Sequence, residues 1–292
     1  MQLDDIISHP SKVLTQDQRE DYFAQGYLAF PDLIDRAQLD CLRDAMARTV
    51  ERSRALTAST EAFDLEPDHC AEAPKLRRAT YLDDHEAVIW ELCADSIIPD
   101  IATDLLGPNL RFREIMLNFK WARGGAEVKW HQDAPFYPHT HTGTCQFLVM
   151  LEDVGPEQGP LQLIPGSHKG PAFAHYGDDG EWTGAIRPVD LKEFDLEDAV
   201  TITGGAGTVT VHHSLMVHGS AQNASTRGRP ALVIGYSAAD AIPYTAPPYP
   251  SSHYGKLIRG VEPGIAHHEA MTMPLPPDWS GGYTSIFEHQ EK

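Results

Sequence analysis

The chain has 292 residues, of which 41% are hydrophobic, and this length and composition suit one large domain with a real core. Its formal net charge of -19, from 42 acidic and 23 basic residues, repels a polyphosphate backbone. No apolar run approaches the roughly eighteen residues that a membrane helix needs. We therefore expect a soluble protein that binds neither nucleic acid nor membranes.

The N-terminus and the cysteines indicate a cytoplasmic location. The first ten residues contain two aspartates ahead of any basic residue and no apolar stretch, unlike a secretory signal. The four cysteines are far apart and form no C-x-x-C pair, which argues against a zinc knuckle or a disulfide framework. We expect buried free thiols at Cys41, Cys70, Cys93 and Cys145.

The first third of the chain has helical patterns. A capping box at Thr15–Gln18 predicts a helix over 16–25, and Asp35 is the expected cap of a second helix. Residues 54–79 are polar and lack hydrophobic periodicity, which indicates a long irregular connection. Residues 88–106 again have apolar residues at helical spacing.

From residue 110 onward, short segments rich in β-branched and aromatic residues alternate with Gly, Pro and Asp turns. Such strands favour a sandwich or a jelly roll. The strands expected are 110–121, 144–151, 161–164, 199–202, 207–211 and 231–237. Two long connections, 168–199 and 241 to the C-terminus, carry little periodicity, and we expect them to shape a substrate pocket.

A metal site is predicted by His131 and Asp133, which lie two residues apart at the expected end of a strand and so should project to one face. An imidazole with a carboxylate suits iron(II), and a second, distant imidazole would complete a face that leaves three positions open. On its own, the H-x-D pattern is weak evidence, because one such triplet can occur by chance in a chain with fifteen histidines.

Further motifs follow in a characteristic order: GPLQLIPGSH at 159–168, VHGS at 217–220, and Arg229. With the His131–Asp133 pair, this set resembles the phytanoyl-CoA dioxygenase family, which includes ectoine hydroxylases. The resemblance extends from about residue 15 to residue 236.

The resemblance implies a mainly β fold with flanking helices, a double-stranded β-helix (jelly roll, cupin-like). One domain would span 1–292, with a helical part at about 15–106, a β-helix core at about 110–238 and a C-terminal extension at 239–292. The implied activity is that of an iron(II)- and 2-oxoglutarate-dependent dioxygenase, which uses O2 to oxidise a small molecule and releases succinate and CO2.

The resemblance also assigns site residues. Iron would be bound by His131, Asp133 and His218. Arg229 would bind the far carboxylate of 2-oxoglutarate through two charge-assisted hydrogen bonds, and the nearby Arg227 is expected at the surface.

Asn118 and Ser220 are implied as further polar partners of 2-oxoglutarate, although Asn118 could equally be bonded to backbone at a strand end. Phe136, Tyr137 and His139 follow the metal pair and are expected to border the substrate, with core packing, or for His139 a solvated loop, as the alternative.

Other histidines fit less well. His212 and His213 match no position of the family, and the second H-x-carboxylate pattern, His267 and Glu269, is followed only by His289 in an expected frayed tail.

Two other functions remain open at the level of sequence: a cupin-like isomerase or hydrolase that does not use O2, and a noncatalytic barrel that binds a small ligand. The carboxylate of Asp133 favours hydroxylation, because halogenases of the family have a small residue in its place. The native substrate is not defined by the sequence.

Overall fold

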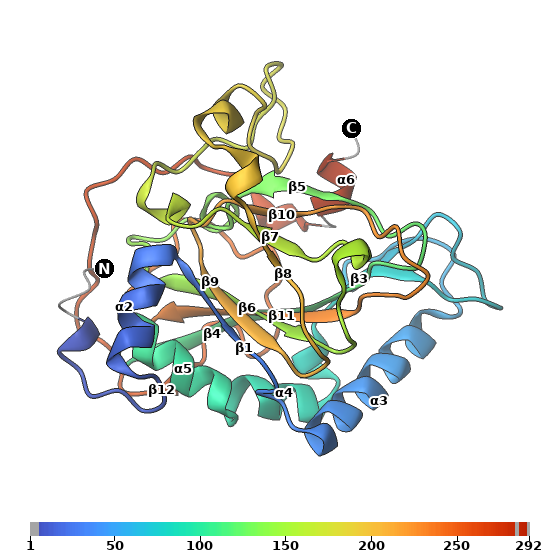
Figure 1. The fold of residues 1–292 in the computed structure, drawn as a ribbon, viewed down its shortest axis with the longest axis horizontal. Helices are drawn as coiled ribbons and strands as arrows, with labels where there is room; N and C mark the ends of the chain where they lie inside the picture. Colours follow the sequence, from blue (N-terminus) through green and yellow to red (C-terminus); the bar gives the residue numbers. More distant parts are fainter. Residues whose placement is uncertain (1–5, 284–285, 291–292) are drawn as a thin grey trace.

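The computed structural model describes residues 6–283 and 286–290, and its centre is a pair of antiparallel sheets (Figure 1). The larger sheet has the order β1-β9-β6-β11-β4-β3-β2, with β12 paired to β4, and the smaller has the order β5-β10-β7-β8. The strands are β1 (Tyr27–Phe30), β2 (Phe63–Leu65), β3 (Leu76–Thr80), β4 (Leu110–Asn118), β5 (Val128–His131), β6 (Thr144–Met150), β7 (Leu161–Leu163), β8 (Val200–Ile202), β9 (Val209–His213), β10 (His218–Ser220), β11 (Ala231–Ala238) and β12 (Leu257–Arg259).

Helices cover the outer face of the larger sheet, on the side away from β5 and β10 (Figure 1). They are α2 (Gln16–Gln25), α3 (Arg36–Ser53), α4 (Ala87–Ala94) and α5 (Ile97–Leu106), while α6 (Ile286–Gln290) lies beside β5. The core between helices and sheet contains fully buried side chains from both, among them Tyr22, Leu42, Leu92, Ile101, Phe112 and Phe147.

Local capping explains the helix boundaries. The Thr15 side chain accepts from the Gln18 backbone, so the predicted capping box and helix are confirmed. Asp35 likewise accepts from the Gln38 backbone at the start of α3. The stretch 88–106 is two helices, because Ser96 caps a second start by accepting from the backbone N–H of Ile98.

Three expectations about the fold and the cysteines were wrong. Residues 54–79 contain β2 and most of β3, which extend the larger sheet beyond β4. The expected frayed tail contains α6, where the buried Gln290 accepts from the Lys129 backbone at 2.8 Å and donates to the Gly184 carbonyl at 2.9 Å. Cys93 and Cys145 are buried, but Cys41 and Cys70 are exposed.

Most strand predictions are confirmed to within a few residues, and β9 extends two residues further than expected, to His213. Among the described ranges, no helix is both long enough and apolar enough to cross a membrane. The two sheets therefore provide the frame, and the segments after β4 place functional side chains between them.

Candidate active site

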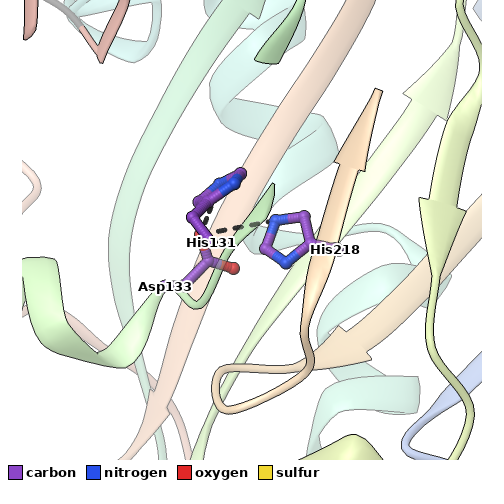
Figure 2. A group of neighbouring side chains, drawn as sticks. All are labelled: His131, Asp133 and His218. Carbon is purple, nitrogen blue, oxygen red and sulfur yellow. Dashed lines mark ion pairs between the residues drawn. The ribbon is translucent and has the colours of Figure 1, made fainter. Parts of the chain in front are cut away.

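Three side chains predicted as metal ligands come together between β5, β10 and the turn after β5 (Figure 2). His131 and His218 are direct partners in the antiparallel pairing of β5 with β10. Asp133 follows at the start of a 3-10 helix over Ala134–Phe136. The Nε2 atoms of His131 and His218 lie 3.9 Å and 3.8 Å from Asp133 Oδ1. Their potential ligand atoms thus face one point.

Hydrogen bonds fix which nitrogen of each histidine is free. His131 Nδ1 lies 2.8 Å from the Lys129 carbonyl, and His218 Nδ1 lies 2.9 Å from the Met216 carbonyl. A carbonyl oxygen can only accept, so Nδ1 carries the hydrogen in both rings and each Nε2 presents a lone pair. This is the tautomer that a metal ligand needs.

Burial also sets the charge of the three groups. It lowers the pKa of His218 to about 4 and that of His131 well below the usual range of histidine. Burial alone would raise the pKa of Asp133, but His218, His212 and His131 together hold it below its usual value. At neutral pH the site therefore contains two neutral imidazoles and one carboxylate, which together suit a divalent cation.

A fourth histidine supports this carboxylate. His212 is a buried residue of β9, and its Nε2 lies 3.1 Å from Asp133 Oδ2. It is not among the three residues whose ligand atoms cluster, so it contacts the site through Asp133. The alternation of β9 is the signal that could have found it, since Val209 and Val211 point into the helix-covered core and His212 points to the other face.

Gln132, which lies between His131 and Asp133 in the chain, is fully buried and holds this turn in place. Its side-chain amide donates to the carbonyls of Pro171 and Leu215, at 3.0 Å and 2.8 Å. Its backbone N–H donates to His175 Nε2 at 3.0 Å. These hydrogen bonds hold the backbone from which the side chains of His131 and Asp133 project.

A cavity of about 130 Å³ adjoins the three residues. Arg229, at the entry to β11, lines it and is buried, and its Nε has no hydrogen-bond partner among the described residues. Burial lowers its pKa to about 10, so the guanidinium stays charged at neutral pH. Arg227 is exposed and donates to Gln158, which confirms that it lies at the surface.

Asn118 and Ser220 line the same cavity. Asn118 Oδ1 accepts from Arg78 Nε at 3.1 Å. Among the described residues, the Asn118 side chain forms no hydrogen bond to backbone, so the alternative expected for it is not observed. Ser220 follows a register shift between β10 and β5.

Of the three residues expected near the substrate, Phe136 and Tyr137 line the cavity. The Tyr137 hydroxyl accepts from Gln146 Nε2 at 2.7 Å. His139 does not line the cavity: it is buried, not solvated, and its Nδ1 lies 2.6 Å from the Tyr137 carbonyl.

Other potential ligands lie elsewhere. His267 is exposed and pairs with Asp240, outside any cluster of three ligand atoms in the described ranges. A second cluster, Asp83, Asp84 and His253, is separate from the cavity, and its His253 Nδ1 is already bonded to Asp83 at 3.0 Å.

Comparison with known proteins bears on the family and the fold. Residues 22–231 match the family described as phytanoyl-CoA dioxygenase (PhyH). A relative from Stutzerimonas stutzeri, named as a probable alpha-ketoglutarate-dependent hypophosphite dioxygenase, is 31% identical over 229 residues, which cover 78% of this chain and 80% of the relative. The ectoine dioxygenase of Sphingopyxis alaskensis is 25% identical over 73% of this chain and 72% of its own length.

The chain therefore belongs to the phytanoyl-CoA dioxygenase family. It is an iron(II)- and 2-oxoglutarate-dependent dioxygenase, an oxidoreductase, and not one of the alternatives without O2 chemistry. The crystal structure of EctD from S. alaskensis with 2-oxoglutarate and 5-hydroxyectoine superposes with a TM-score of 0.68 over 91% of this chain and 93% of that one, at 22% identity. The predicted double-stranded β-helix is thereby confirmed.

Proposed function

We propose that His131, Asp133 and His218 bind the iron(II). The supporting observation is that two imidazoles with free Nε2 lone pairs and one ionised carboxylate converge from β5, β10 and the adjoining turn. This donor set fits iron(II), and it occupies one face of the metal, so three positions stay open. Once 2-oxoglutarate and O2 are bound there, iron supplies the oxidising chemistry that side chains lack.

Arg229 is the proposed anchor for the far carboxylate of 2-oxoglutarate. It is a buried cation in the wall of the metal cavity, and it forms no ion pair with a described carboxylate. A buried, uncompensated guanidinium favours an anionic ligand, because a carboxylate replaces the lost hydration through two hydrogen bonds.

Asn118 and Ser220 are proposed as additional partners of the cosubstrate. Because Asn118 Oδ1 accepts from Arg78, the amide is oriented with its NH2 group available as a donor. The Ser220 hydroxyl can donate or accept from the same cavity wall.

The proposed reaction is hydroxylation of a small molecule in the cytoplasm. Asp133 keeps the carboxylate in the ligand set, which favours hydroxylation over halogenation. Phe136 and Tyr137 border the cavity, and their rings would restrict water beside the reacting carbon.

Succinate formation tests the ligand assignment. We expect His131→Ala and Asp133→Ala to abolish succinate production from 2-oxoglutarate in protein supplied with iron(II) and O2, because each removes one of three donors. His267→Gln, which changes an exposed histidine outside the cavity, serves as the matched control and should keep the wild-type rate. Full turnover in either alanine variant would show that another set of residues binds the iron.

A further inference from the structure

The metal cavity contains a second buried cation. Arg78, on β3, is 6% exposed and lines the same cavity as Arg229. Its Nε donates to Asn118 Oδ1, and its Nη1 donates to the Tyr249 hydroxyl. Its remaining amino nitrogen, Nη2, forms no hydrogen bond of normal geometry with a described residue, and Arg78 also interacts with the nearby Tyr283 hydroxyl. Arg78 thus retains an unused donor beside the reaction site.

No described carboxylate forms an ion pair with Arg78. Asp64, its cross-strand partner on β2, accepts from the Ser59 hydroxyl and acts on Arg78 only at longer range, without a direct ion pair. Among the described residues that line the cavity, only Asp133 is acidic. Iron(II), Asp133, the 2-oxoglutarate dianion and Arg229 are together electrically neutral, so Arg78 adds a positive charge that no described carboxylate in the cavity wall balances. A buried charge of this kind requires a counter-ion.

Two tyrosine hydroxyls lie with Arg78 in the cavity wall. Tyr249 accepts from Arg78, so its own hydrogen is free to be donated, and the buried Tyr283 hydroxyl has no hydrogen-bond partner among the described residues. The two rings are 5.4 Å apart between centroids. Burial raises the pKa of both hydroxyls, so both keep their protons at neutral pH. Guanidinium and hydroxyl hydrogens are the donors that an oxyanion needs.

The two arginines are held by different neighbours, which separates their roles. Arg229 precedes β11 and has an unpartnered Nε. Arg78 is bonded to Tyr249, a residue of the C-terminal extension that packs with Phe136 and Tyr283 in one cluster at the cavity. Arg78 therefore faces the part of the cavity that the C-terminal extension closes.

We propose that Arg78, with the hydroxyls of Tyr249 and Tyr283, binds an oxyanion of the substrate, so that the substrate is a small carboxylate or phosphorus oxyanion. This inference rests on the proposed function, because it assigns 2-oxoglutarate to Arg229. The cavity volume of about 130 Å³ is consistent with a small molecule.

Anion binding in the cosubstrate-loaded protein tests the proposal. The full chain is loaded with manganese(II) and saturating 2-oxoglutarate, and propionate, methylphosphonate and propionamide are titrated by calorimetry. We expect at least one of the two oxyanions to bind about tenfold or more tightly than the neutral amide, and which one it is tells carboxylate from phosphorus oxyanion. Arg78→Gln should abolish that preference, Arg78→Lys should keep part of it, and Arg187→Gln, which removes a surface arginine paired with Asp190, should keep all of it.

A separate titration of 2-oxoglutarate into the same variants distinguishes the two arginines. Arg78→Gln should weaken its affinity by less than about tenfold, through loss of the hydrogen bond that orients Asn118, whereas Arg229→Gln should weaken it by about a hundredfold. The proposal is overturned if neither oxyanion binds better than propionamide, or if Arg78→Gln weakens 2-oxoglutarate as much as Arg229→Gln. Succinate formation by the iron-loaded wild-type protein without added substrate is measured independently, and its absence would count against the proposed function instead.

Discussion

His212 Nε2 lies 3.1 Å from Asp133 Oδ2, whereas the other carboxylate oxygen, Oδ1, is the one that faces His131 and His218. A donor on Oδ2 leaves Oδ1 as the metal-facing oxygen and opposes rotation of the carboxylate. Such a partner usually changes the metal affinity of a site even though it does not touch the metal. We therefore assign His212 a positioning role.

Replacement of His212 should weaken metal binding. We expect His212→Phe, which keeps the ring but removes the donor, to raise the Kd for manganese(II) by about 10–100-fold. His212→Gln can still donate and should recover part of the loss. Calorimetric titration of the apoprotein gives the Kd without turnover, with His267→Gln as a control for histidine content. Equal Kd values for the Phe variant and the wild type would contradict the assignment.

Variants of Arg229 and Arg227 allow a matched test of cosubstrate binding. Arg229→Gln should weaken 2-oxoglutarate binding by about 3 kcal/mol, more than a hundredfold, because a buried charge-assisted pair is lost. Arg227→Gln removes the same charge two residues away at the surface and should leave the apparent KM for 2-oxoglutarate unchanged. If both variants behave alike, the anchor lies elsewhere.

Stability of the metal-free protein should fall in mild acid. Burial lowers the pKa of His139, His175 and His213 each to about 3, whereas an unfolded histidine titrates near pH 6.5. Between these values the unfolded state binds protons that the folded state does not, so the free energy of unfolding decreases as the pH falls below about 6.5. Each group contributes about 1.4 kcal/mol per pH unit. Urea unfolding at pH 7.5 and pH 5.5 measures the effect, and identical midpoints would contradict it.

The C-terminal extension should contribute to stability through Trp279. Its side chain is buried against Trp182 and Tyr283, and its Nε1 donates to the Phe136 carbonyl at 2.8 Å. Trp279→Ala should lower the free energy of unfolding by about 3–5 kcal/mol. Trp279→Phe keeps most of the packing and should cost less. Urea denaturation of both variants checks the order, and an alanine variant as stable as wild type would show that the segment is not packed in solution.

Sequence patterns identified much of the fold, because local signals determine it. Both capped helices, α2 and α3, follow from side-chain acceptors that the sequence shows directly. Strands β4, β6, β7, β8, β9 and β11 match the short runs expected between turns, whereas the three-residue strand β10 was not among them. By contrast, β3 contains adjacent arginines, Arg77 and Arg78, and a strand with charged residues lacks the apolar pattern that distinguishes it from an irregular connection.

The candidate metal ligands were predictable because H-x-D and the distant histidine occur in a fixed order of motifs. The partners of those residues were not. The contact of His212 with Asp133 depends on a strand end that the pattern placed two residues too early. The contact of Arg78 with Tyr249 joins residues 171 positions apart, and no local spacing encodes such a pairing.

The direct pairing of His131 with His218 has a further consequence for metal selectivity. Backbone hydrogen bonds between β5 and β10 set the separation of the two imidazoles, so the site is preformed. It therefore cannot select iron(II) by folding around that ion. Preformed nitrogen and oxygen ligands bind copper(II) and zinc(II) more tightly than iron(II). Zinc and copper should therefore displace iron and inhibit this enzyme, and the supply of metal in the cell, not the protein, would decide which ion it carries.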